Sequence, residues 1–150
     1  MGGRSLADQE VHWDESVVGP ILDQGQCGCC WAFSSTTVLA GSIAAINGTP
    51  YEHLSEQHLI ECTKAGSAVN RALFPKANQV CINQGCNGGF LEITKMFMVE
   101  YGSIPYDTYP REYIASDQND CEHDFSQVVN ASAWGSVSRD EDVIAEKLQT

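Results

Sequence analysis

The sequence predicts a globular fold that is mainly helical. Its 150 residues, of which 43% are hydrophobic, have the composition of an ordinary soluble protein of one domain or slightly more. Helical signals occur in the segments 30–46, 55–62 and 90–101, and again after Ser138. The sequence contains no internal repeat and no low-complexity tract.

Charge excludes two classes of partner. The chain carries 20 acidic and 8 basic residues, a net charge of −12 and a pI near 4.5. No basic stripe is left to neutralise phosphates, so nucleic acids and anionic membranes are not expected as partners. No run approaches the roughly 18 apolar residues of a membrane span. Residues 1–5 lack the apolar stretch of a secretory signal, so any targeting segment is expected to precede the chain.

The N-terminal part of the chain carries few signals of regular structure. Residues 1–12 are polar without a period and predict an extended arm. The short apolar stretch Val17–Leu22 is interrupted by Gly19 and Pro20, which favours a loop or an edge segment over a strong strand.

The segment 30–46 predicts a helix that is buried on most sides. Its residues are small or apolar almost all round, from Trp31 to Ile46. Asn47 and Gly48 then form a C-terminal stop, because both tolerate the left-handed conformation that closes a helix.

A short helix is expected to follow Ser55. Its hydroxyl can cap the helix, Glu56 and Gln57 suit the first turn, and the helix should end near Cys62. Residues 63–85 have no period and predict a long exposed loop.

The segment 90–101 predicts a third helix. Its apolar stripe should be core, and Gly102 should end it. The stripe consists of Phe90, Ile93, Thr94, Phe97, Met98 and Tyr101.

Residues 103–129 have no regular pattern and predict irregular structure. The acidic run Asp140–Asp142 then opens a last amphipathic helix that carries Val143, Ile144 and Leu148. No stop signal follows, so the chain is expected to be cut inside a larger fold.

The seven cysteines indicate an oxidising compartment. They exceed what a reduced cytosolic domain usually carries, and three bridges would leave one thiol over. The sequons at Asn47 and Asn130 are candidate glycosylation sites, which agrees with a secretory route.

Residues 24–34, with the sequence QGQCGCCWAFS, carry the chemistry. Cys30 stands at the first turn of the buried helix, where the dipole and unpaired backbone N–H groups stabilise a thiolate. Gln24 lies six residues earlier, on a loop held by Gly25 and Gly28. Its amide can donate to an oxyanion that also meets the Cys30 N–H. The alternative interpretation of Cys30 is a structural, buried cysteine.

This segment resembles the active-site signature of the papain family of cysteine proteases, which includes the cathepsins. Further motifs follow in the family's order: Trp13-Asp14 resembles the start of the mature enzyme, and Leu54-Ser55-Glu56-Gln57 its second helix. Gly85-Cys86-Asn87-Gly88-Gly89 resembles its glycine-rich substrate strand, and Tyr106 to Pro110 its tyrosine-rich stretch.

The resemblance implies an α+β fold of papain type. Residues 13–135 would be its helical left-hand half and residues 136–150 the start of its β-rich right-hand half. Because the two halves of such a fold pack against each other across the active-site cleft, the helical half alone should expose apolar surface.

The resemblance also implies a cysteine-type endopeptidase. Cys30 would attack the peptide carbonyl to form a thioester acyl-enzyme, while Gln24 and the Cys30 N–H hold the oxyanion. Gly88 and Gly89 would pair with the substrate backbone, and Trp31 would shield the site.

Specificity, partners and compartment follow from the same resemblance. Phe90 and Leu91 would form the wall of the main specificity pocket, which favours a bulky apolar substrate residue. The implied partners are a peptide or protein substrate, a propeptide and a cystatin-type inhibitor. The implied compartment is lysosomal, vacuolar or extracellular, and neither a cofactor nor a metal is expected.

The family pairings imply two disulfides, Cys27 to Cys86 and Cys62 to Cys121. Cys29 departs from the family, which usually has serine before the nucleophile.

Cys81 is a further additional cysteine, and three arrangements are open for the pair. A bridge between Cys29 and Cys81 would leave Cys30 as the free thiol. A zinc site could use Cys27, Cys29, Cys81 and Cys86. A vicinal disulfide between Cys29 and Cys30 would silence the nucleophile until it is reduced.

The general base has no candidate in the chain. The family's base is a histidine, oriented by an asparagine, roughly 130 to 150 residues beyond the nucleophile, and those positions lie past Thr150. His12, His53, His58 and His123 match no motif position of the base and are expected to be surface or helix-edge residues. The chain alone is therefore expected to be inactive or nearly so. The alternative function is a non-catalytic truncated homologue that binds peptides or protease inhibitors.

Overall fold

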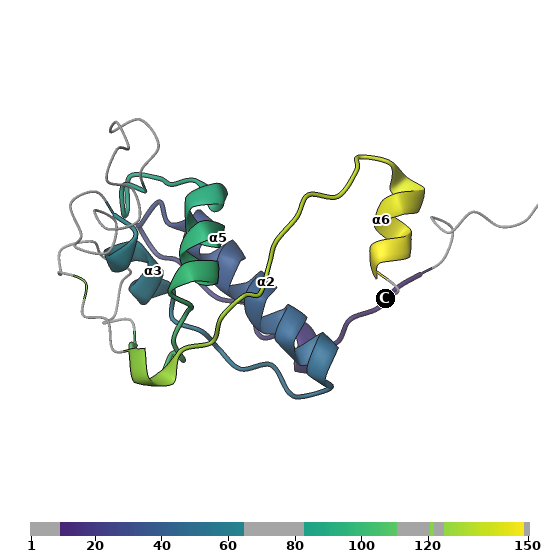
Figure 1. Ribbon diagram of the computed structural model, residues 1–150, viewed down its shortest axis with the longest axis horizontal. Helices are drawn as coiled ribbons and strands as arrows, with labels where there is room; N and C mark the ends of the chain where they lie inside the picture. Colours follow the sequence, from purple (N-terminus) through teal and green to yellow (C-terminus); the bar gives the residue numbers. More distant parts are fainter. Residues whose placement is uncertain (1–9, 65–82, 111–120, 122–124, 149–150) are drawn as a thin grey trace, which may run out of the picture.

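The computed structural model describes residues 10–64, 83–110, 121 and 125–148. The helices are α1 (Glu15–Val18), α2 (Cys30–Asn47), α3 (Glu56–Cys62), α5 (Leu91–Glu100) and α6 (Glu141–Leu148), with a 3-10 turn at Phe125–Gln127 (Figure 1). In these residues, pairing between extended segments is limited to isolated bridges. This mainly helical architecture agrees with the helical half that the resemblance implies.

Helix α2 is the central element. It contacts α1, α3 and α5 (Figure 1). Its predicted end is confirmed, because Gly48 adopts the left-handed conformation with φ 62° and donates its N–H to Ala44 O. The prediction that α2 is buried on most sides is wrong: Val38 is 68% and Ile46 83% exposed. The other helices cover one face of α2 and leave an apolar face open.

Helix α3 begins as predicted but lies deeper than predicted. The Ser55 hydroxyl accepts from His58 N at 3.0 Å and caps the helix, which ends at Cys62. Every residue of α3 is buried, and His58 is 0% exposed. The expectation of a surface or helix-edge position for His58 is therefore wrong. Its ring packs edge-on against Phe97, with centroids 5.4 Å apart, and lies close to Tyr109.

Helix α5 confirms the predicted apolar stripe, apart from its first residue. Ile93, Thr94, Phe97 and Met98 are buried. Phe90 is 48% exposed, because it is the extended N-cap residue rather than part of the helix. The stripe is therefore core from Ile93 to Met98, and Tyr101, the C-cap residue, packs against this core partly buried.

Helix α1 was not predicted, since Val17–Leu22 indicates a loop or edge segment. The Asp14 carboxylate accepts from Ser16 N at 2.9 Å and starts the helix. Gly19, with φ 72°, ends it after one turn by donating its N–H to Glu15 O. Four residues are too few to show a period, so only the capping residue could have indicated this helix.

The C-terminal segment leads away from the helical core. Residues 129–140 run to α6, which stands apart from α2, α3 and α5 in Figure 1. The last helix is confirmed, with its first turn at the acidic run. No strand is assigned between residues 136 and 148, and the domain boundary near residue 135 stays a prediction.

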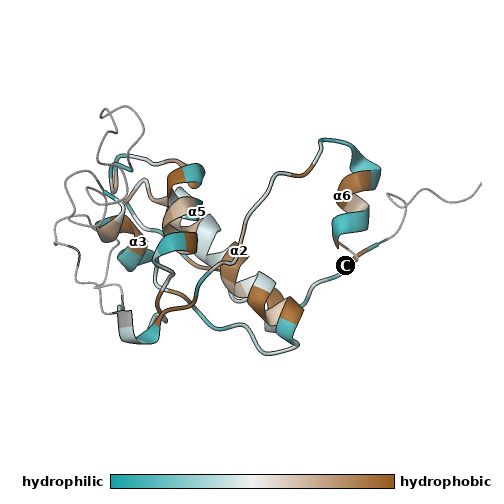
Figure 2. Cartoon of the chain, in the orientation of Figure 1, coloured by the Kyte–Doolittle hydropathy of each residue, from teal (hydrophilic) through white to brown (hydrophobic). Residues whose placement is uncertain are grey.

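Apolar residues are exposed, as expected for a helical half. Figure 2 shows hydrophobic residues along α2. A groove of about 530 Å³ lies between α2, α5 and residues 130–135. Exposed apolar residues at its margins are Val38, Ile46, Leu91 and Trp134. Several expectations concern residues outside the described ones: the arm up to residue 9, most of the 63–85 loop, Cys81 and His123.

We expect Gly19→Ala to destabilise the chain more than Gly48→Ala. Both glycines have positive φ, 72° and 62°, but an added Cβ would lie 2.5 Å from the Tyr51 ring at Gly19 and meets nothing within 4 Å at Gly48. Backbone strain alone should cost about 1 kcal/mol at Gly48, and strain plus overpacking about 3 kcal/mol at Gly19. Urea unfolding of the two variants measures the difference. Equal losses would show that the Tyr51 ring moves aside without cost.

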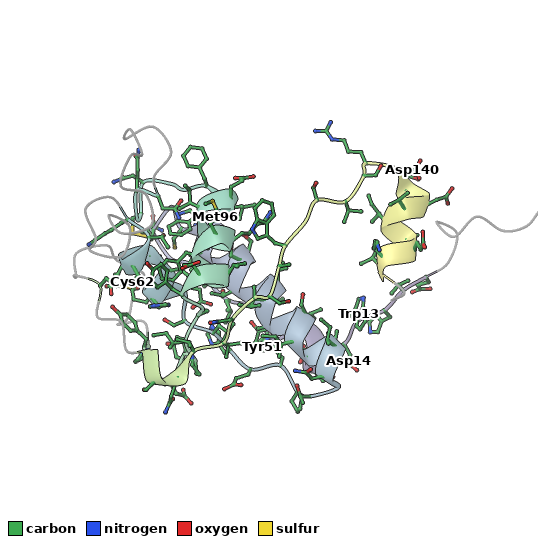
Figure 3. All side chains as sticks on the ribbon, in the orientation of Figure 1. Trp13, Asp14, Tyr51, Cys62, Met96 and Asp140 are labelled. Atoms are coloured by element: carbon green, nitrogen blue, oxygen red, sulfur yellow. A yellow bond between two sulfur atoms is a disulfide. The ribbon has the colours of Figure 1, made fainter. Side chains whose placement is uncertain are left out.

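Tyr51 should make stability fall at alkaline pH. Burial raises the pKa of Tyr51, the charge of Glu56 adds to this, and a hydrogen bond with Thr37 opposes it. Figure 3 shows Tyr51 beside α2. The folded state holds the phenolic proton more tightly than the unfolded state. This contribution is complete below a pH of about 10 and is lost as the pH rises through the folded pKa. Tyr51→Phe should flatten the unfolding free energy above that pH, and parallel curves would contradict the assignment.

Candidate active site

Cys30 is the first residue of α2, and its thiol is free and exposed. The preceding residue, Cys29, is the N-cap and accepts the first helical hydrogen bonds, from Ala32 N and Phe33 N. The exposure of Cys30 contradicts the alternative of a structural, buried cysteine. Its free thiol likewise contradicts a vicinal disulfide with Cys29.

Both disulfides implied by the family pairings are present. Cys27 and Cys86 are bonded with their Cα atoms 4.5 Å apart, and Cys62 is bonded to Cys121. The first bond consumes two of the four ligands proposed for zinc, so that alternative is wrong. In the described part of the chain, no cluster of three or more His, Cys, Asp or Glu could hold a metal.

Cys29 is buried, with Sγ 3.6 Å from Cys27 O. Its pairing with Cys81 stays a prediction.

The glycine segment, residues 85–89, lies against the loop that leads to Cys30. Gly28 donates its N–H to Cys86 O at 2.9 Å, and Gly28 and Asn87 form a parallel bridge. A Cβ on Gly28 would lie 2.6 Å from Cys86 O. Only glycine therefore permits this approach of the two backbones.

Trp31 packs beneath the glycine segment. Its indole is 3% exposed and donates Nε1–H to Gly85 O at 3.3 Å. A Cβ on Gly89 would lie 2.6 Å from the indole. Trp31, the residue after the nucleophile, thus fixes the position of the glycine segment relative to α2. Shielding of the site by Trp31 stays a prediction.

Gln24 belongs to the same loop as the nucleophile. Its Nε2 donates to Cys27 O at 2.7 Å. This bond ties the Gln24 amide to the backbone of the loop that leads to Cys30. A side-chain amide has two N–H groups, so one donor is left for a ligand.

Phe90 and Leu91 follow the glycine segment and are 48% and 40% exposed. They stand at the start of α5, where a bound ligand could reach them.

The histidines do not complete the site in the described residues. His53 lies against Glu56, with Nε2 2.8 Å from Oε1, and stacks on Tyr106. His58 is buried in the core and His12 is exposed. None of these three is bonded to Cys30, and the placement of His123 is not described.

One residue of the site was missed by the sequence reasoning. Asn83 is 0% exposed and bonds to the start of α5 beside the glycine segment. It follows no periodic pattern. Its only signal is a position three residues before Cys86, which does not by itself indicate a role.

We expect Gly28→Ala to separate the two backbones of the site. The added Cβ would lie 2.6 Å from Cys86 O. This carbonyl cannot move away easily, because Cys86 is held by its disulfide to Cys27. The variant should lose about 1 to 3 kcal/mol of unfolding free energy, measured by urea titration. Gly135→Ala is the control, because a Cβ there meets nothing within 4 Å. A neutral Gly28→Ala would mean that the loop is loosely held.

Comparison with known proteins agrees with this geometry. The model of the papain family cysteine proteases matches residues 7–150. The chain is 33% identical over 143 residues to a probable cysteine protease, RD19B, of Arabidopsis thaliana, covering 93% of this chain and 37% of that protein. It is 37% identical over 130 residues to digestive cysteine proteinase 1 of Homarus americanus, covering 85% and 34%.

A solved structure is similar over the same range. Digestive procathepsin L 3 of the Tenebrio molitor larval midgut superposes with a TM-score of 0.72 at 31% identity, covering 93% of this chain and 40% of that one. The chain spans little more than a third of the length of these relatives. None of the helices in the described segments is long and apolar enough to cross a membrane. With the nucleophile loop, the glycine segment and both disulfides in place, the chain belongs to the papain family of cysteine proteases.

Proposed function

We propose that the chain supplies the nucleophile and the substrate-binding segment of a cysteine endopeptidase. The observation that carries the proposal is the free, exposed thiol of Cys30 at the N-terminus of α2, beside a glycine segment that a disulfide holds in place. A helix N-terminus stabilises a thiolate through its dipole and its unpaired N–H groups.

The first half of the reaction uses residues of this chain. The Cys30 thiolate attacks the carbonyl carbon of the scissile peptide. The Cys30 N–H and the second N–H of Gln24 donate to the oxygen that becomes negative. Collapse of this intermediate breaks the C–N bond and leaves a thioester on Cys30, while the departing amine takes up a proton.

The glycine segment is suited to pair with an extended peptide. A Cβ on Gly88 would meet nothing within 4 Å, so the space above its backbone is open. Phe90 and Leu91 then offer apolar surface next to the peptide, which favours a bulky apolar substrate residue.

The departing amine must take its proton from the protonated form of a general base, and the described residues do not supply that base. The described histidines are engaged or lie elsewhere, as with His53 on Glu56. We propose that the chain alone is inactive or nearly so. This observation also favours a second candidate, a non-catalytic homologue that binds extended peptides, a propeptide or a cystatin-type inhibitor without turnover.

The compartment we propose is lysosomal, vacuolar or extracellular. Two disulfides are stable in an oxidising environment and rare in the cytosol. The sequon residues Asn47 and Asn130 are both exposed, which leaves room for glycans.

The labelling of Cys30 tests the nucleophile. Iodoacetamide should alkylate Cys30 faster than a free thiol such as glutathione at neutral pH, with the product located by peptide mass spectrometry, and Cys30→Ala should abolish the product. Labelling at the rate of a free thiol would argue against an activated nucleophile.

Hydrolysis separates the two candidate functions. In a longer protein that contains the base, cleavage of a fluorogenic peptide should vanish in Cys30→Ala and fall about a hundredfold in kcat in Gln24→Ala, as for other oxyanion donors. Peptide binding without any cleavage in that protein would establish the non-catalytic candidate instead.

A further inference from the structure

We propose that Asn83 is a positioning residue that sets how tightly the site holds a peptide. The inference rests on the function proposed above. Asn83 is 0% exposed, so it would act through its neighbours rather than by touching the peptide. It acts by fixing the end of the glycine segment and the start of α5 in one place relative to the nucleophile.

The Asn83 side chain joins its own segment to the end of α3 and to the start of α5. Its Nδ2 donates to Thr63 Oγ1 at the end of α3, at 2.8 Å, and to Thr94 Oγ1 in α5, at 3.2 Å. Its Oδ1 accepts from Phe90 N, the N-cap residue of α5, at 2.6 Å. Asn83, Thr63 and Thr94 are all 1% exposed or less. The two bonds to the threonines are therefore sheltered from water, where losing one is most costly, and the bond to Phe90 N is partly buried.

The two threonines fix the orientation of the amide. Thr63 Oγ1 donates its proton to Leu59 O at 2.7 Å, and Thr94 Oγ1 donates to Phe90 O at 3.2 Å. A hydroxyl has only one proton, so both can only accept from Asn83. The NH₂ group must face them, and the carbonyl oxygen is directed at Phe90 N–H.

Gly89 lies in a slot whose second wall is the same amide. A Cβ at Gly89 would be 2.6 Å from the Trp31 indole and 2.7 Å from Asn83 Oδ1. Trp31 follows the nucleophile directly and is buried in the core. Gly89 is thus clamped between Trp31 of α2 and Asn83. The next residue, Phe90, is half-exposed.

Loss of the clamp should affect peptide binding more than thiol reactivity. The backbone at Gly88 and Gly89 and the Phe90 wall would no longer hold one position, so binding would have to order them. The environment of Cys30, set by α2 and by the Cys27–Cys86 bond, would stay the same.

The test uses the 150-residue chain and two electrophiles. A peptidyl chloromethyl ketone with a bulky apolar residue gives an inhibition constant KI and a limiting rate for alkylation of Cys30, and iodoacetamide reports thiol reactivity without peptide binding. Asn83→Ala should raise KI about tenfold, the cost of one buried hydrogen bond, with the iodoacetamide rate within about twofold of wild type.

Three threonine variants separate positioning from general destabilisation. Thr63→Val removes an acceptor of Asn83 at a site remote from the peptide, and it should also raise KI. Thr63→Ser keeps the hydroxyl and should restore the wild-type value. Thr36→Val is the matched control, because Thr36 is equally buried but bonds only within α2, to Ala32 O and Phe33 O. It should lower stability and leave KI unchanged. If Asn83→Ala does not fold, the comparison of KI between Thr63→Val and Thr63→Ser tests the positioning role.

Two outcomes would be read differently. If wild type saturates with the peptidyl reagent and KI is unchanged in both Asn83→Ala and Thr63→Val, the positioning inference is overturned while the proposed function stands. If wild type does not saturate, the proposed function fails, and amide hydrogen exchange at Phe90 decides the positioning. Exchange should then be about tenfold faster in Asn83→Ala and Thr63→Val than in Thr36→Val, and equal rates would overturn it.

Discussion

The structure depends on one junction, at which the backbone around Cys27 and Gly28 meets Cys86. A disulfide, between residues 59 apart in sequence, and a backbone hydrogen bond join the two segments of this junction. In the unfolded chain the cost of closing such a loop falls mainly on conformational entropy, and a disulfide removes much of that cost. The nucleophile and the segment proposed to bind substrate are therefore held together by a covalent constraint that also packs in the hydrophobic core, of which Cys27 is a member.

The glycines around this junction are consequences of the same close approach. Gly28 has room for no Cβ because Cys86 O lies against it, and Gly89 has none because Trp31 and Asn83 fill the space. Gly88 differs from both. Nothing surrounds its missing Cβ, and its φ of 107° is a conformation that side chains rarely adopt. Two glycines are thus required by packing, while Gly88 is required by backbone conformation and leaves a surface open to a ligand.

The sequence predicted those features that depend on local chemistry. Capping of α3 by Ser55, closure of α2 by Gly48 and the position of Cys30 at a helix start all follow from a few neighbouring residues. Features that depend on distant parts of the chain were missed. His58 lies on a polar-looking helix, but its burial depends on Phe97 and Tyr109, which are about 40 and 50 residues away. Asn83 likewise shows no signal in the sequence, because its hydrogen-bond partners Thr63, Phe90 and Thr94 belong to other segments of the fold.

The exposed apolar face of α2 begins close to the nucleophile. Its apolar groove, between α2, α5 and residues 130–135, begins at Ser34, one helical turn after Cys30. Leaving Val38, Ile46 and Trp134 in water is unfavourable, so a covering element gains hydrophobic free energy by packing there. The open side of the helical half therefore includes Ser34, the residue one turn along α2 from Cys30.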